Sequence, residues 1–98
     1  AVHSVYESLG ETAFHNISQA NPDQLADRFS PTLFDSILIA FYLAERDGLE
    51  IPDPQDAARR KFDLLKNPDY QRLLTQETMR VPNIRDRIFQ AYNVLFQG

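Results

Sequence analysis

The amino-acid sequence predicts an all-α domain, a compact bundle of about five to six helices around one buried helix at about 31–47. Two observations lead to this class. Apolar residues recur at spacings of three and four, and no segment alternates with period two for long enough to indicate a strand. A small polar residue followed by proline, a typical helix start, occurs at 21–22, 30–31, 53–54 and 67–68.

The first two helices are expected in the N-terminal third of the chain. One should run from about Ser4 to Gln19, and its apolar stripe is Val2, Tyr6, Leu9, Ala13 and Ile17. Gly10 inside this segment costs about 1 kcal/mol relative to alanine. A short second helix should follow Pro22, with apolar contacts made by Leu25, Ala26 and Phe29.

The central helix has clear signals at both ends. Ser30 can cap it, and Pro31 suits its first turn, where a backbone N–H would lack a partner. Gly48 is a natural left-handed stop. Because residues 37–44 are all apolar, we expect that no face of this helix is free for water.

Three further helices complete the predicted bundle. The fourth follows Asp53 and should bury Ala57, Ala58, Phe62 and Leu65. Asn67 and Pro68 start a short fifth helix, whose apolar members are Tyr70, Leu73 and Leu74. The last should run from Met79 or Pro82 to Phe96, with an inward stripe of Ile84, Ile88, Ala91, Tyr92 and Leu95. Short connections favour antiparallel neighbours.

Length and composition limit the classes of function. The 98 residues are enough for one domain, 1–98, which is either whole or a piece of a longer chain. The absence of cysteine excludes disulfides and thiolate metal sites. No segment has the roughly 20 apolar residues of a membrane span. We therefore expect a cytoplasmic protein without a membrane partner.

The net charge of −4 conceals two halves of opposite sign. Residues 1–56 carry ten acidic side chains and two arginines, whereas residues 57–98 carry eight basic and four acidic side chains. Two interpretations stay open. The halves can pack with complementary charge and a solvated surface, or the basic half can meet a phosphate backbone or an acidic partner.

The second interpretation identifies a set of DNA-contacting candidates, namely Arg59, Arg60, Lys61, Arg80, Arg85 and Arg87. The first three cluster on the fourth helix, and Arg80 and Arg87 share a face of the last one. If those faces adjoin, they contact several phosphates and position DNA without reading its sequence. Arg87 has a structural alternative, in which it is partly buried beside Ile88 and holds an Asp or a carbonyl.

One polar stripe has regular spacing, since His3, Glu7, Glu11 and His15 are each four positions from the next. An i, i+4 pair of such side chains can supply two ligands to a divalent metal. Four residues advance a helix by about 40°, so the four side chains drift too far to converge on one ion. A solvated face explains the stripe better.

Catalytic patterns are missing from the sequence. It contains no glycine-rich phosphate loop and no nucleophile elbow, and few hydroxyls accompany its two histidines. Asp53 and Asp56 are explained as a cap and a first-turn charge. We therefore predict no catalytic residue, cofactor site or metal site in this chain.

A family resemblance begins near Asp27. The segments FSPTLFD (29–35), an apolar helix, FDLLKN (62–67) with Tyr70, and Ile84-x-x-Arg87-Ile88-x-x-Ala91-x-x-x-Leu95 follow one another. This order resembles the helical C-terminal part of ParB-like nuclease proteins related to GmrSD-type, modification-dependent restriction enzymes. The similarity covers about 70 of the 98 residues.

The resemblance implies a role in prokaryotic defence against phage DNA. The nuclease chemistry of such proteins lies in an N-terminal domain with an Asp-Gly-Gln-rich motif, which this chain lacks, since Asp47-Gly48 is followed by Leu49-Glu50. The chain would then be a non-catalytic accessory module that docks to another domain or subunit, including a second copy of itself. Docking predicts an exposed apolar patch of several hundred Å². DNA-backbone binding through the basic half is the alternative.

Overall fold

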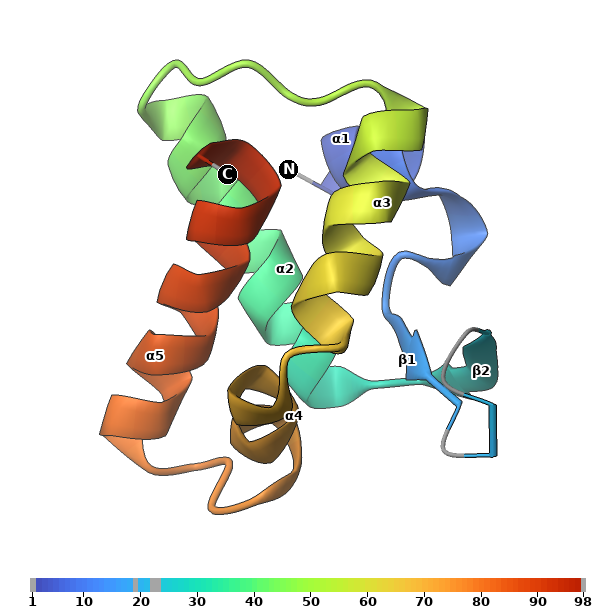
Figure 1. The fold of residues 1–98 in the computed structure, drawn as a ribbon. Coiled ribbons are helices and arrows are strands. Elements are labelled where there is room, and N and C mark those ends of the chain that lie inside the picture. Colours follow the sequence, from blue (N-terminus) through green and yellow to red (C-terminus); the bar gives the residue numbers. More distant parts are fainter. Residues whose placement is uncertain (1, 19, 22–23, 98) are drawn as a thin grey trace.

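The computed structural model describes residues 2–18, 20–21 and 24–97, and the fold that they form is mostly helical (Figure 1). Five α-helices, a two-stranded sheet and two irregular helical turns follow in the order α1 (Val2–Leu9), η1 (Gly10–Thr12), β1 (His15–Ile17), β2 (Leu25–Phe29), α2 (Pro31–Arg46), α3 (Pro54–Leu65), α4 (Pro68–Thr75), α5 (Val81–Tyr92) and η2 (Asn93–Gln97). With 70% helix and 7% strand, the predicted all-α bundle is confirmed.

Helix α2 begins and ends where the sequence predicted. The Ser30 side chain accepts a hydrogen bond from the backbone N–H of Leu33 at 3.3 Å, and Pro31 occupies the first turn. Asp47 closes the C-terminal end. Gly48 then takes a φ of 74°, a conformation that side chains other than glycine's rarely adopt, and turns the chain away from the helix.

One face of α2 is buried, and the opposite face is open to solvent. The buried side chains are Leu33, Ser36, Ile37, Ala40, Phe41 and Ala44. Ile39 is 38% exposed and Tyr42 is 57% exposed. The expectation that no face is free for water was therefore wrong. A chain of this length builds only a thin bundle, so α2 has neighbours on one side and solvent on the other.

Helices α1, α4 and α5 pack against α2. Helix α5 runs beside α2 in the same direction, and the Tyr92 hydroxyl near its C-terminal end donates to Asp47 at 2.9 Å (Figure 1). This pair is parallel because α3 and α4 lie between the two helices in the sequence and return the chain. The antiparallel packing expected of neighbouring helices thus does not extend to the pair at the centre of the bundle.

Two polar side chains meet in the core at the centre of the fold. The Tyr70 hydroxyl of α4 lies 2.5 Å from the Ser36 hydroxyl of α2. Ser36 donates its own proton to the carbonyl of Leu33 at 3.3 Å, so Tyr70 must donate to Ser36. Burial raises the pKa of the Tyr70 phenol well above its ordinary range, because the charged form would lose its hydration.

The N-terminal third differs from the prediction. Helix α1 ends at Leu9, since Gly10 takes a φ of 73°, and η1 leads into β1 rather than into more helix. Strand β1 pairs antiparallel with β2, with His15 opposite Phe29. The helix expected over 4–19 is thus shorter, and the short second helix is a strand. Gln19 and Pro22, where two of the expected limits fall, lie outside the described residues.

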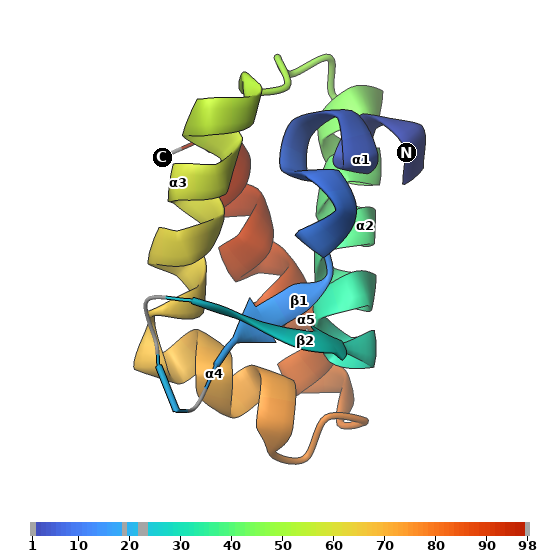
Figure 2. The ribbon, with the colours of Figure 1, turned by 90° about the vertical axis from the view of Figure 1, so that its right-hand side faces the viewer.

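Tertiary contacts explain why His15–Ile17 and Leu25–Phe29 form paired strands. Phe14 is buried just before β1, and its ring lies 4.7 Å from that of Phe34 at the start of α2. The Asn16 and Gln71 side-chain amides exchange hydrogen bonds of 3.0 and 2.7 Å, which attach β1 to α4. Figure 2 shows the sheet between α1 and α4. Phe29, expected to point inward, is 56% exposed.

The three C-terminal helices match the prediction closely. Asp53 caps α3 and Asn67 caps α4, each by accepting backbone N–H hydrogen bonds with its side chain. Tyr70, Leu73 and Leu74 of α4 are buried as expected. On α3, Ala58 was expected to be buried but is exposed, and Lys61 is buried instead. Helix α5 begins at Val81 with Pro82 in its first turn and continues into the wider turn η2, which keeps Leu95 buried.

We predict that Ile37→Asp unfolds the domain while Ile39→Asp, only two positions along α2, leaves it folded. Ile37 is fully buried, and an unpaired charge there costs several kcal/mol, a large part of the stability of a small domain. Ile39 reaches solvent, so a carboxylate there stays hydrated. Circular dichroism during thermal unfolding would compare the two. An Ile37→Asp variant that melts like the wild type would contradict the burial of α2.

Candidate functional site

An open apolar groove of about 420 Å³ lies between α2 and α5. Its walls are formed by Ile39, Leu43, Arg46 and Asp47 from α2 and by Arg85, Ile88, Phe89 and Tyr92 from α5. These residues, together with Tyr42 on the outer side of α2, are called the α2–α5 face below.

The helical repeat places these side chains in two rows. On α2 they follow each other at i, i+4, i+7 and i+8, and on α5 at i, i+3, i+4 and i+7, so each set lies on one side of its helix. Because α2 and α5 run side by side in the same direction, the two rows form opposite walls. The local sequence thus makes the rows, and the packing of the helices makes the groove.

The α2–α5 face exposes large apolar side chains. Phe89 is 61% exposed, and Ile39 and Tyr42 reach solvent from the neighbouring helix. Isolated exposed apolar residues are ordinary on protein surfaces, but a contiguous group beside a groove is typical of an interaction site. The α2–α5 face thus combines exposed apolar side chains with an open groove.

Charged groups stand at the two ends of the groove. Arg46 donates to the Asp47 carboxylate at 3.3 Å, and the same carboxylate accepts the Tyr92 hydroxyl, which raises the pKa of that phenol. Arg85, near the other end, has no hydrogen-bond or ion-pair partner within the part of the chain that the structure describes. The groove is thus apolar along its length and cationic at its rim.

Two of the six predicted DNA contacts are buried. Lys61 is 3% exposed, and its amine donates to the carbonyl of Thr12 at the end of η1. Arg87 is 2% exposed and donates to the carbonyl of Thr78 at 2.7 Å. The carbonyl-bound, structural alternative for Arg87 is therefore confirmed.

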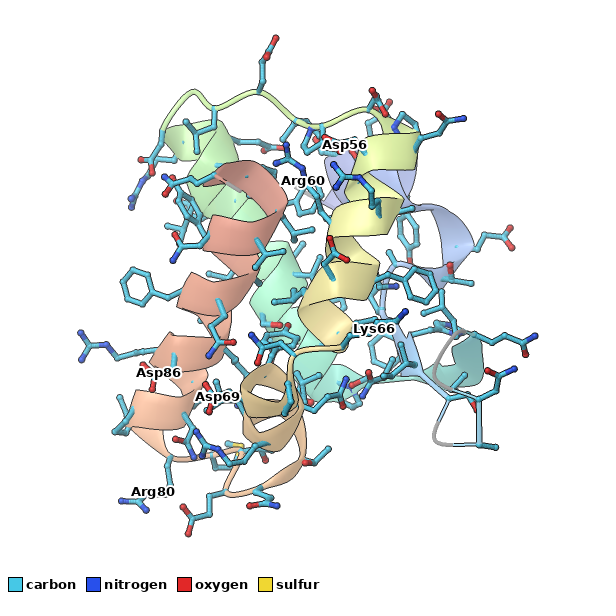
Figure 3. The ribbon with its side chains drawn as sticks, in the orientation of Figure 1. Asp56, Arg60, Lys66, Asp69, Arg80 and Asp86 are labelled. Atoms are coloured by element: carbon cyan, nitrogen blue, oxygen red, sulfur yellow. The ribbon has the colours of Figure 1, made fainter. Side chains whose placement is uncertain are left out.

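The other predicted contacts are separated in space. Arg59 and Arg60 both pair with Asp56, and Arg80 pairs with Glu77 at 3.0 Å. The hydrogen bond from Arg59 lowers the pKa of the Asp56 carboxyl. Figure 3 places Arg60 and Arg80 at opposite ends of the molecule. The fold thus does not gather the six candidates in one surface.

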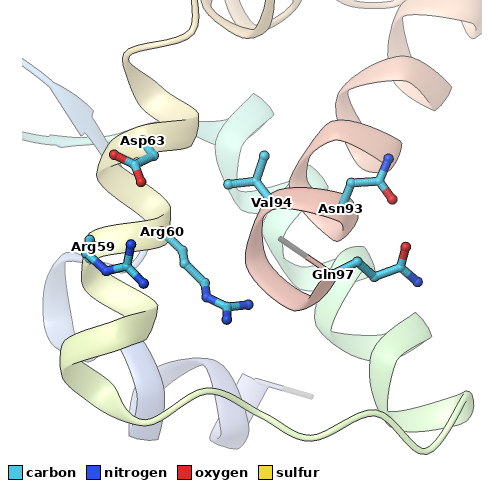
Figure 4. A pocket seen from close by; sticks show the side chains of 6 residues that line it. All are labelled: Arg59, Arg60, Asp63, Asn93, Val94 and Gln97. Carbon is cyan, nitrogen blue, oxygen red and sulfur yellow. The ribbon is translucent and has the colours of Figure 1, made fainter.

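A second, polar pocket of about 540 Å³ lies between α3 and η2 (Figure 4). It is lined by Arg59, Arg60, Asp63, Asn93, Val94 and Gln97. Arg60 extends across the gap and donates to the carbonyl of Leu95 at 2.9 Å, while its other side pairs with Asp56. Both guanidiniums already face carboxylates, so this pocket provides an internal contact between α3 and η2.

The histidine and glutamate stripe is divided among three elements. His3 and Glu7 pair at 2.7 Å on the exposed side of α1, but Glu11 lies in η1 and His15 in β1, where its Nδ1 is 2.7 Å from the carbonyl of Ala26. The i, i+4 relation is lost because α1 ends at Leu9. In the described ranges, no group of three or more His, Cys, Asp or Glu side chains is placed to hold a metal ion.

None of the helices in the described segments is both long and apolar enough to cross a membrane. Comparisons of this chain with protein-family models, curated proteins and solved structures gave no match. The resemblance to the restriction-related family therefore stays a prediction.

The sequence reasoning missed most of the α2–α5 face. Ile88 and Tyr92 were assigned to the inner stripe of the last helix, and Ile39 to an all-buried helix. A signal was present in α5, where Arg85 and Phe89 are spaced four apart and lie on the outward side. The counterpart on α2 carried no such signal, because apolar residues cover all its sides.

We predict that Lys61 makes stability rise with pH. Burial lowers the pKa of its amine from 10.5 to about 8. Both states hold the proton below pH 8, whereas between pH 8 and 10 the unfolded chain holds more protons, so the free energy of unfolding rises by about 2 kcal/mol. Urea titrations at several pH values would measure this rise.

Lys61→Met should remove the rise, and Lys66→Met, which changes an exposed lysine just after the same helix, should retain it. The comparison separates the effect of the buried amine from that of removing a lysine in general. An unchanged pH dependence in Lys61→Met would mean that the buried amine is not the source.

Proposed function

We propose that this chain is a helical interaction module, which docks to another protein domain or subunit through the α2–α5 face. The observation that carries the proposal is Phe89, a 61% exposed aromatic side chain on the rim of an open apolar groove. Aromatic anchors of this kind provide much of the binding energy in protein interfaces.

The energetics favour covering this face. Burying the exposed part of Phe89 stabilises a complex by about 1–2 kcal/mol, before the cost of association. Ile39, Tyr42 and Leu43 add apolar area on the other wall. A groove between two parallel helices suits a third helix, which fits its own apolar row between the walls.

The charges of the rim indicate what the partner should carry. Arg85 has no partner within the described segments, and Arg46 keeps donors to spare beyond its contact with Asp47. Acidic side chains at the ends of the partner helix would pair with them, and a basic partner would be repelled. The arrangement therefore favours an apolar helix with acidic flanks.

The biological setting is the one that the family resemblance implies, a non-catalytic part of a restriction-type, phage-defence protein. A ParB-like domain encoded in the same open reading frame would support it. We favour docking over DNA-backbone binding because two of the six candidate cations are buried and three of the others face carboxylates.

Selection of displayed helical peptides of about four turns on the immobilised domain would test the groove, and we expect apolar peptides with acidic ends. Phe89→Glu should weaken their binding at least about tenfold. Met79→Glu is the matched control, since Met79 is also a large exposed apolar residue but lies outside the groove. A selection without binders, or binders indifferent to Phe89→Glu, would contradict the proposal.

A further inference from the structure

We propose that a second copy of this chain covers the α2–α5 face, with α2 packed antiparallel against α2 of the partner subunit. The inference rests on the proposed function, because it names the partner for the same surface. Its basis is the order of charged and apolar side chains along the outer side of α2.

Four side chains form a straight outer stripe on α2. Asp35, Ile39, Tyr42 and Arg46 follow at i, i+4, i+7 and i+11, which keeps them within an arc of about 60° at 3.6 residues per turn. All four are exposed. The stripe is acidic at its N-terminal end, apolar in the middle and basic at its C-terminal end.

This order is complementary to itself when reversed. If a two-fold axis passes beside the helix between the levels of Ala40 and Phe41, Asp35 faces the partner's Arg46. In the same register, Ile39 faces the partner's Tyr42. A single antiparallel alignment therefore gives two opposite-charge pairs and two apolar pairs, as an isologous interface requires.

The charges also exclude the parallel alignment. A parallel pair would place two Asp35 carboxylates together at one end and two Arg46 guanidiniums at the other. Asp35 has no hydrogen-bond or ion-pair partner among residues 2–18, 20–21 and 24–97. The Arg46 guanidinium has donors beyond the one directed at Asp47, so it can hold a second carboxylate.

Helix α5 takes part in the same association. If the two-fold axis runs across both helices, it reverses α5 together with α2, because the two are parallel within one chain, and places α5 against its own copy. Phe89 lies beside the stripe on this side, so the assembly covers it. The dimer would then contain a contact of four helices in which Tyr42 and Phe89 become buried.

Analytical ultracentrifugation over a range of concentrations tests the association. We expect a reversible dimer of the wild type. Asp35→Arg and Arg46→Asp should each raise the dimer dissociation constant at least about tenfold, because each creates two like-charge contacts. A wild type that stays monomeric at high concentration, or single variants that dimerise as well as the wild type, would overturn the inference.

Mixing the two variants tests the register. In a heterodimer of Asp35→Arg with Arg46→Asp, both charge pairs become attractive again, so dimers should reappear in the mixture. In the control mixture, Asp63→Arg, an exposed change of the same kind on α3, replaces Asp35→Arg; because it keeps the wild-type stripe, it should dimerise with itself and leave Arg46→Asp monomeric. Circular dichroism confirms that each variant is folded. A mixture that stays monomeric would overturn the antiparallel register.

The experiment separates this inference from the proposed function. If the wild type is monomeric while selected peptides still depend on Phe89, the groove is a docking site for a different partner and only the self-association is wrong. If dimers obey the charge pattern but no peptide binds, docking of a separate helix is wrong and the face serves self-assembly.

Discussion

The burial of one side of α2 is the constraint on which the rest of the structure depends. Helices α1, α4 and α5 pack against this side, and Ser36 is the polar residue among its buried side chains. Unpaired, that hydroxyl would cost about 1–3 kcal/mol, but it donates to Leu33 and accepts from Tyr70. Because Tyr70 lies on α4, this pair holds α4 against α2. The β1–β2 sheet is attached to α4 in turn, through the hydrogen bonds between Asn16 and Gln71.

The same arrangement accounts for the candidate interface. With one side of α2 in the core, Ile39 and Tyr42 on the other side reach solvent, and Phe89 of the adjacent α5 is also exposed. The structure also changes the interpretation of the charge of the C-terminal half. Asp56 of the N-terminal half pairs with Arg59 and Arg60 and so offsets part of the basic excess of the C-terminal half, although each exposed pair adds only about 0–1 kcal/mol to stability. The charge count of that half therefore overstated its attraction for phosphate.

Local rules predicted the ends of most helices. Ser30, Asp53 and Asn67 cap their helices with their own side chains, and the proline that follows each of them occupies the first turn. Such contacts span three or four residues, so they can be inferred from the sequence without knowing the fold. Gly10 carried the same kind of information, since its left-handed conformation ends α1. The apolar residues on both sides of Gly10 keep the helical spacing, so periodicity alone predicted a helix that continues past Gly10.

The sequence by itself determined the helical class, the capped helices α2 to α4 and the burial of Tyr70, Leu73 and Leu74, because capping and periodicity act over a few residues. Only the tertiary structure decided that His15–Ile17 and Leu25–Phe29 pair as strands, since strand pairing and the amide contacts of Asn16 depend on residues far away in the chain. It also decided which side of the all-apolar α2 meets water. Residues 37–44 are apolar on every side of the helix, so the sequence does not show which side is buried. The side that α1, α4 and α5 do not cover is the one exposed to solvent.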